Sequence, residues 1–394
     1  MAAGGAIFEA PFTLARSAEA EEHAQAALAA LVSAAQDAAG EAFLGAALGG
    51  PLGSGEGAVV RAADGSLVPA DPFELLVVVD APLRTAAALG RRVKRAVTET
   101  ARSRRIVATV DVTARAALPF LRPTLRTLEL VGSGRVAAGR PVLLDGAPDP
   151  ARTRPDPREG LRLLVRRGSD LLRAEAIADR TPRGRAAREA LRIVSETDLA
   201  LGAVVLLSAG RWVPGLRARD VVLKDLASGG VTDRSAAGFH ARMTWTRFRD
   251  LVERYRGAVE ARAEGPDAFT RGDPRRQVGR AADRWLEVLR LSEEERLGQT
   301  LPDWTEHAAA LARRSAAEAD GILFEDAFAD DGARRATRRA ARAWDAAERI
   351  GPAVAALVDC DPGDLPIVPV LLDLADGSPR EAMRQRAIAW GAAI

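Results

Sequence analysis

The stretch DPFELLVVVD, residues 71–80, decides the fold class of this chain. Its centre, ELLVVV at 74–79, is a continuous apolar run behind a single acid, which is typical of a sheet strand covered on both faces. Asp80 follows as the expected N-cap of the next helix, which carries Pro82 in its first turn. A second apolar strand, IVATVDVT, follows at 106–113. The order strand, helix, strand predicts a small mixed sheet with helices packed on it.

The residues around these two strands predict the rest of a small domain. Ser17 is a favourable N-cap and Gly40 a favourable stop for a long helix. Asp64 and Gly65 form a strong turn dipeptide between two short segments, which favours a hairpin. The further elements expected are helices at 17–40 and 80–103, a strand at 41–48, a hairpin of 57–62 and 65–69, and an edge strand, RPVLLDG, at 140–146.

The pattern changes near residue 150. The stretch APDPARTRPDPREG at 147–160 is rich in proline and charge, which is typical of a linker. Beyond it one helical pattern follows another, and the breaks between them carry proline or glycine. We therefore expect an α+β protein, in which a mixed-sheet domain at 1–150 precedes an all-helical domain at 151–394. The helices are expected at 158–178, 184–209, 215–228, 235–263, 276–291, 303–319, 331–349 and 379–392.

Composition and charge restrict the function. The 394 residues include 56 basic and 54 acidic side chains, so the net charge of +2 predicts no nucleic-acid partner. Cys360 is the only cysteine, which excludes an internal disulfide and a cysteine-rich zinc site. The most apolar long run, at 199–209, is far shorter than a membrane span and predicts a buried helix. Because the N-terminus also lacks a secretory signal, we expect a cytoplasmic protein with no membrane partner.

The glycine-rich stretch GGPLGSGEG, at 49–57, is the first candidate for a functional site. Without side chains on its glycines, such a loop can turn backbone N–H groups toward an anion. A helix that starts nearby would add its dipole to that attraction. The loop is therefore a candidate phosphate-binding element, although glycine-rich surface loops without a ligand have the same composition.

Two acids in the predicted strands are the second candidate. Glu74 begins the first strand, and Asp111 lies in the middle of VATVDVT. A carboxylate inside an apolar strand is costly unless it is paired, hydrogen-bonded or bound to a cation. Either acid also has an ordinary structural explanation: Glu74 can reach solvent from the strand end, and Asp111 can be a buried acid with satisfied hydrogen bonds.

With these residues in view, the chain resembles the nucleotidyltransferase superfamily, the fold shared by aminoglycoside nucleotidyltransferases and DNA polymerase beta. Members carry a G-S-x-x-R-G-E motif, then an Asp-x-Asp pair at the start of a strand, then a third Asp in a later strand. Here GPLGSGE at 50–56 aligns with the first motif, PFE at 72–74 with the acid pair, and Asp111 with the third acid. The resemblance covers about residues 25–225, and it includes LELVGSGRVAAGRPVLL at 128–144 and LSAGRWVPGLRARD at 207–220.

The resemblance implies a mechanism for an active member. Carboxylates would hold two magnesium ions that bind a nucleoside triphosphate and activate the attacking hydroxyl. Glu74 and Asp111 are the implied metal ligands, with Asp71 as a third catalytic candidate. Arg61 or an arginine from the helical half would supply further positive charge. The implied nucleotide-binding residues are Gly50, Gly53, Ser54, Gly55 and Glu56.

The chain departs from the family pattern at the motif positions that bind metal and phosphate. Pro72 replaces the first acid of the pair, and Glu74 replaces the second with a longer acid. Asp71 lies three residues from Glu74, so its side chain should point to the opposite face of the strand. In the glycine loop, Pro51 stands at the serine of the motif and Ser54 at its arginine.

Three hypotheses for the function follow. The first is a non-canonical or catalytically impaired nucleotidyltransferase-fold protein that acts in binding, scaffolding or regulation, with a protein partner bound by the helical domain. The alternative is an active magnesium-dependent enzyme that transfers a nucleoside monophosphate from a nucleoside triphosphate to a small-molecule or protein acceptor. The third is an unrelated helical interaction protein with a chance glycine loop, which a mixed sheet with Glu74 and Asp111 side by side would contradict.

Overall fold

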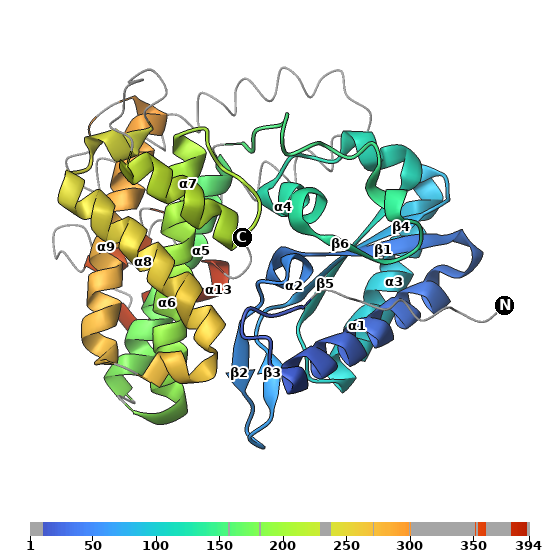
Figure 1. The fold of residues 1–394 in the computed structure, drawn as a ribbon, viewed down its shortest axis with the longest axis horizontal. Helices are drawn as coiled ribbons and strands as arrows, with labels where there is room; N and C mark the ends of the chain where they lie inside the picture. The colour runs from blue at the N-terminus through green and yellow to red at the C-terminus, as the bar shows by residue number, and fades with distance from the viewer. Residues whose placement is uncertain are drawn as a thin grey trace. The chain divides into compact units, whose positions relative to one another are not determined.

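The computed structural model describes residues 11–156, 158–180, 183–228, 238–270, 272–298, 300, 351, 354–359 and 380–391. The chain divides into two compact units, whose elements are labelled in Figure 1. The first unit comprises Met1–Asp156 together with two later segments, Trp212–Lys224 and Arg256–Ala268. The second comprises Pro157–Arg211, Asp225–Tyr255 and Phe269–Ile394. The first unit therefore takes in helical segments from the later part of the chain.

A four-stranded mixed sheet forms the centre of the first unit. Its strand order is β5-β4-β1-β6, in which β4 and β5 run parallel and β1 is antiparallel to both β4 and β6. A separate hairpin pairs β2 with β3. The strands are β1 (Phe43–Gly49), β2 (Val59–Arg61), β3 (Leu67–Pro69), β4 (Phe73–Val79), β5 (Ala108–Ala114) and β6 (Arg135–Ala138).

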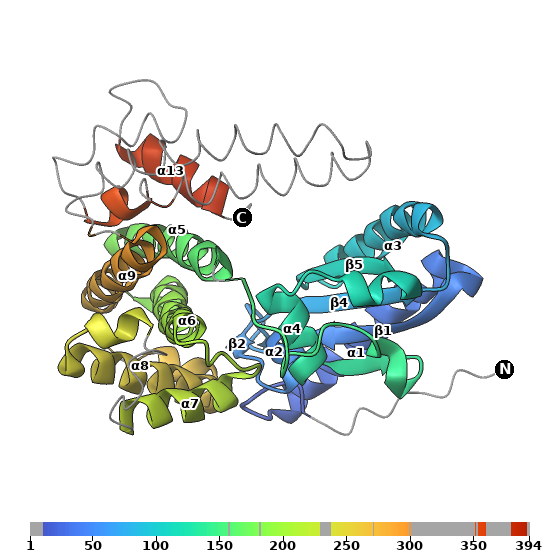
Figure 2. The same cartoon turned by 90° about the horizontal axis from the view of Figure 1, so that it is seen from above.

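Both faces of the sheet are covered, which explains the apolar run at 74–79. Side chains of β4 alternate between a core shared with α1 and α3 and a core shared with α4 and two short 3-10 helices, η2 and η3. Figure 2 shows these elements from above. Each fully buried Val or Leu in β4 contributes about 1.5–3 kcal/mol to stability. The covering elements are α1 (Ala18–Ala39), α3 (Leu83–Ser103), η2 (Arg115–Phe120), α4 (Leu125–Ser133) and η3 (Pro141–Leu144).

Most of the predicted elements of this unit are confirmed. Ser17 caps α1 through its side chain, and the hairpin forms where the Asp64-Gly65 turn predicts it. Two expectations are wrong. Asp80 does not cap α3, because the helix begins at Leu83 with Pro82 in the cap position. The segment 140–146 contains the 3-10 helix η3, and the edge strand is formed by the preceding residues of β6.

The second unit is helical in its described residues. The long apolar run at 199–209 is buried in α6, as its composition predicts. Trp285 of α9 lies in the core, where its indole N–H donates to the carbonyl of Leu164 at 2.8 Å. α8 begins at Trp245 rather than near 235, and the predicted helices at 303–319 and 331–349 lie outside the described residues. In the described part of the chain after residue 157, the labelled α-helices are α5 (Arg158–Arg180), α6 (Gly184–Ser208), α7 (Leu216–Ser228), α8 (Trp245–Glu264), α9 (Pro274–Leu297) and α13 (Arg380–Gly391).

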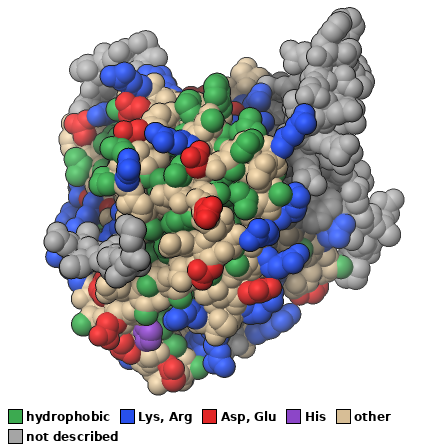
Figure 3. Space-filling view, turned by 90° about the vertical axis from the view of Figure 1, so that its right-hand side faces the viewer, with side chains coloured by type: hydrophobic (Ala, Val, Ile, Leu, Met, Phe, Trp, Pro, Cys, Tyr) green, Lys and Arg blue, Asp and Glu red, His purple; other side chains and the backbone are tan. Residues whose placement is uncertain are grey.

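The surface carries charges of both signs. Figure 3 shows one face, on which acidic and basic side chains alternate around exposed apolar ones. Among the described helices, none combines the length and the apolar character that a membrane crossing requires.

Candidate functional site

The parallel pairing of β4 and β5 brings the two candidate acids onto one face of the sheet. Glu74 pairs in register with Thr109, and Leu76 pairs with Asp111. Residues that pair directly across a sheet share a face, as do residues two apart in one strand. The three polar side chains Glu74, Thr109 and Asp111 therefore project to the same side. The mixed sheet and the shared face are the arrangement expected of the nucleotidyltransferase-like site, and the relation to that family stays a prediction.

The guanidinium of Arg126 joins these three side chains. Its Nε donates to Oε2 of Glu74 at 3.0 Å, its Nη1 to Oδ2 of Asp111 at 2.7 Å, and its Nη2 to Oγ1 of Thr109 at 2.8 Å. A guanidinium presents its donors in a fixed planar fork, so three acceptors placed around it form a set matched to its shape. We call Glu74, Thr109 and Asp111 the acceptor set. A cation from the protein itself thus lies between the two acids.

The acceptor set spans the edge strand β5 and its neighbour β4, and it is open to solvent. The expectation that Asp111 is buried is wrong, because β5 is an edge strand and this side chain is 52% exposed. Its other oxygen, Oδ1, lies 3.5 Å from the ammonium nitrogen of Lys94 in α3. Arg126 is 42% exposed, whereas Glu74 is 22% exposed. The two acids are therefore neutralised by two cations whose side chains retain access to water.

A cavity of about 290 Å³ lies beside the acceptor set. Glu74, Asp111 and Arg126 line it, so the ionic groups are part of its wall. The remaining wall combines apolar and hydroxyl-bearing side chains of the sheet and of α4. These are Leu75, Leu76, Val112, Thr113, Leu121, Thr124, Thr127 and Leu130, with Gly49 completing the lining.

Asp71 does not join the other two acids. Its Oδ2 accepts from the backbone N–H of Ala58 at 2.6 Å and lies 2.9 Å from Nη1 of Arg262, which belongs to α8. The guanidinium of Arg262 is 2% exposed and also donates to the carbonyl of Glu56 at 3.2 Å. The third catalytic candidate is thus one half of a buried ion pair within the first unit.

The glycine loop forms a short helix, α2 (Gly50–Ser54), and several of its carbonyls and the Ser54 hydroxyl bond to other groups of the protein. Gly50 begins it with a φ of +62°, and a Cβ there would lie 2.9 Å from Oε1 of Glu74. The carbonyl of Gly53 accepts from Nε of Arg135 at 2.8 Å. Ser54 donates its hydroxyl to the carbonyl of Pro51 at 3.1 Å. Burial lowers the pKa of Arg135, and the nearby charge of Glu21 acts against that shift.

Gly55 ends α2 in the left-handed conformation, and Glu56 follows it as a structural cap. The two carboxylate oxygens of Glu56 accept from the backbone N–H groups of Leu216 and Arg217, at 2.5 and 2.9 Å. Leu216 is the first residue of α7, so Glu56 satisfies amide groups at the start of that helix and complements its dipole. The acid that the family motif assigns to the nucleotide site is 8% exposed and engaged in the fold.

These contacts decide whether the residues fit magnesium. Two of the expected acids hold one guanidinium, and the third holds another. Within the part of the chain that the structure describes, no three His, Cys, Asp or Glu side chains gather where they could hold a metal ion. As arranged here, the acceptor set fits a planar organic cation and does not fit a pair of divalent ions.

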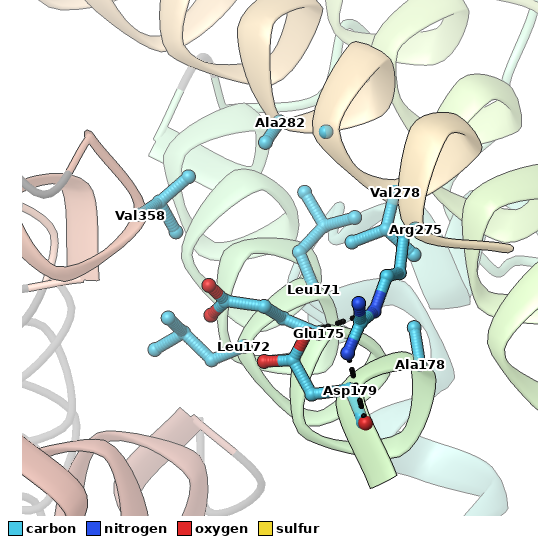
Figure 4. A pocket seen from close by; sticks show the side chains of 10 residues that line it. Leu171, Leu172, Glu175, Ala178, Asp179, Arg275, Val278, Ala282 and Val358 are labelled. Atoms are coloured by element: carbon cyan, nitrogen blue, oxygen red, sulfur yellow. Dashed lines mark hydrogen bonds and ion pairs between the residues drawn. The ribbon is translucent and has the colours of Figure 1, made fainter. Parts of the chain in front are cut away.

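A second cavity, of about 310 Å³, lies in the helical unit (Figure 4). Leucine, valine and alanine side chains of α5 and α9, together with Val358, form most of its wall. Its polar groups bond to neighbours: Arg275 lies 3.3 Å from Asp179, and Glu175 accepts from Arg384 at 3.1 Å. Sequence reasoning pointed to no residue here, and the charged side chains described in this wall are engaged in ion pairs with one another or with α13.

Sequence reasoning missed Arg126, Thr109 and Lys94. One signal for Arg126 was available, because a cation in the first turn of a helix opposes the helix dipole. Such a residue, two positions after the N-cap Thr124, needs negative partners nearby. The two candidate acids were the obvious partners.

Known proteins offer no assignment for this site. Comparisons with protein-family models, with curated proteins and with solved structures found no match for this chain.

Proposed function

We propose that the first unit is a nucleotidyltransferase-like domain that no longer performs two-metal chemistry and acts as a binding or scaffolding module. The observation that carries the proposal is the position of Arg126. Its guanidinium contacts both acids that the family resemblance assigns to the metal ions.

Electrostatics explains why this contact opposes metal binding. Unit charges of like sign 4 Å apart repel by about 4 kcal/mol at an effective dielectric constant of about 20. A divalent ion on Glu74 and Asp111 would meet that repulsion from Arg126 and, more weakly, from Lys94. The ion would also have to displace hydrogen bonds already made to the acids. Arg126 therefore supplies the positive charge that a metal ion supplies in an active member.

The rest of the motif supports the same proposal. Asp71 pairs with Arg262, and Glu56 caps α7, so both acids stabilise the first unit. In the glycine loop, the Gly53 carbonyl accepts from Arg135 and the Ser54 hydroxyl donates to the carbonyl of Pro51, so both groups bond within the protein. Asp71 and Glu56, which align with or lie beside the catalytic motif, thus stabilise the fold of a binding domain. The helical unit is then available for a protein partner.

A second candidate function has one observation in its favour. Arg126 and Lys94 are 42% and 55% exposed, so both side chains have room to turn toward solvent. In an active magnesium-dependent nucleotidyltransferase they would contact the triphosphate and leave Glu74 and Asp111 to hold the ions. This function requires both cations to leave the acids when nucleotide binds.

Two measurements on the full chain distinguish these functions. Titration calorimetry with MnCl₂ compares the wild type with Arg126→Ala and with the control Arg122→Ala, which changes a nearby exposed arginine. We expect Arg126→Ala to bind Mn²⁺ at least tenfold more tightly than the other two proteins. Pyrophosphate release from Mg-ATP and Mg-CTP should be absent in the wild type. Magnesium-dependent release that disappears in Asp111→Asn would contradict the proposal and establish the enzyme.

A further inference from the structure

We propose that the acceptor set and the cavity beside it form a binding site for a small alkylguanidinium compound, which Arg126 occupies in its absence. This inference rests on the proposed function, because the two acids can accept an organic cation only where they hold no metal ions.

The hydrogen bonds of Arg126 show which ligand shape the acceptor set matches. Three acceptors on two neighbouring strands each accept a hydrogen bond from a different nitrogen of this guanidinium, at 3.0, 2.7 and 2.8 Å. An ammonium group concentrates its charge at one point and cannot reach three spread acceptors with one planar face. The geometry therefore favours a guanidinium over an alkylammonium ion.

Arg126 is placed so that it can leave the acceptor set. It lies in the first turn of α4, where the helix dipole disfavours a cation. Its side chain is 42% exposed, so it can turn into water without crossing a packed core. When it turns away, the ion pair between Lys94 and the outer oxygen of Asp111 remains. The vacated acceptor set then presents the carboxylates of Glu74 and Asp111, which attract a ligand cation.

The cavity accommodates the rest of such a ligand. Its volume of about 290 Å³ fits a guanidinium with a short alkyl chain. Leu76, Leu121 and Leu130 offer apolar surface to the chain, while Glu74 and Asp111 lie in the same wall. Charged and apolar groups thus meet in one small cavity, as a ligand with a charged head and an apolar tail requires.

The tether gives Arg126 an advantage over any free ligand. A side chain attached to the site competes at an effective concentration in the millimolar range or above. The wild-type protein should therefore bind alkylguanidinium compounds weakly. Shortening Arg126 should strengthen binding by a large factor without adding any contact.

The experiment uses n-butylguanidine, n-butylamine and the uncharged n-butylurea, titrated calorimetrically into the metal-free full chain. The proteins are the wild type, Arg126→Ala, Arg126→Ala combined with Glu74→Gln, and the control Arg122→Ala. We expect n-butylguanidine to bind Arg126→Ala at least tenfold more tightly than the wild type or the control. The Glu74→Gln change should reverse most of that gain, and the amine and the urea should bind at least tenfold more weakly.

Three outcomes would overturn the inference: equal affinity in the wild type and Arg126→Ala, equal affinity for n-butylurea, or no effect of Glu74→Gln. If circular dichroism shows that Arg126→Ala is unfolded, Arg126→Met replaces it, because methionine keeps an unbranched apolar stem.

In the wild type, the NMR signal of the Arg126 Nε–H should move as n-butylguanidine displaces it. An unmoved signal at saturating ligand would also reject the site. These readouts contain neither metal nor nucleotide, so their failure is separate from failure of the proposed function.

Discussion

The guanidinium of Arg262 lies 2.9 Å from the carboxylate of Asp71 and is almost completely excluded from water, at 2% exposure. This pair gives an acid of the apparent catalytic pattern a structural role. Breaking a buried pair from one side leaves the other charge unpartnered, which is far more costly than losing a surface pair.

Arg262→Ala should therefore destabilise the protein by about 3–5 kcal/mol. Asp71 would lose its cation and the carbonyl of Glu56 would lose a donor. Urea denaturation measures the loss. The matched control is Arg256→Ala, on the same helix, whose pair with Glu260 is exposed on both sides. A loss of stability above about 1 kcal/mol in Arg256→Ala, or equal losses in the two variants, would contradict the conclusion that the buried pair contributes far more than the exposed one.

Glu56→Ala should cost about 1–2 kcal/mol, because two backbone N–H groups at the start of α7 lose their acceptor. Thermal denaturation at neutral pH is the measurement, and Glu99→Ala, an exposed acid in α3, is the control. If Glu56→Ala left stability unchanged but altered nucleotide binding, the capping of α7 by Glu56 would contribute little to stability. Glu56 would then act in nucleotide binding, as the family motif implies.

Two glycines of the helical unit should respond to alanine in opposite directions. A Cβ on Gly168 would overlap the indole of Trp285 and lie 2.6 Å from Cγ1 of Val354, so Gly168→Ala should destabilise by about 1–3 kcal/mol. Gly279 lies inside α9 with no described atom within 4 Å of an added Cβ. Gly279→Ala should therefore stabilise by about 0.5–1 kcal/mol. Chemical denaturation measures the change in the free energy of unfolding for each variant. If Gly168→Ala stabilised the protein as Gly279→Ala does, the packing around Trp285 would have room for the added methyl group.

The pH dependence of stability should carry a contribution from His240. Burial lowers the pKa of this imidazole, which packs beside Phe248 with its ring centre 5.3 Å away. The unfolded chain then binds a proton more readily than the folded one, so stability is retained above about pH 6.5 and lost as the pH falls. Urea midpoints between about pH 8 and pH 5 should fall more steeply for the wild type than for His240→Gln. His23→Gln, which removes an exposed imidazole, is the control, and parallel profiles for wild type and His240→Gln would refute the effect.

The fold was predictable where side-chain pattern and backbone chemistry agreed. The apolar run at 74–79 identified β4, and the turn at Asp64 and Gly65 identified the hairpin. The prediction of a strand at 140–146 was wrong. The apolar residues of this segment pack against the sheet from a 3-10 helix as readily as they would from a strand. Local composition does not distinguish these two ways of covering a core.

The site was predictable only in part. In the structure Asp71 pairs with Arg262, whereas Glu74 and Asp111 share the guanidinium of Arg126, so the two predicted acids meet and the third lies elsewhere. The sequence could not show that Arg126 reaches both acids, since that contact depends on how α4 returns over the sheet. Nor could it show that Glu56 meets a helix 160 residues later in the chain. Long-range pairings of this kind are set by tertiary packing.

The placement of β5 at the end of the sheet has a consequence for solubility. An edge strand exposes backbone groups that can recruit a strand from another molecule, and charged side chains along the edge are a common protection. Asp111, with Arg126 and Lys94 gathered around it, gives the middle of β5 such a hydrated, charged covering. The ionic cluster of Asp111, Arg126 and Lys94 thereby also discourages self-association, so its removal should favour edge-to-edge aggregation.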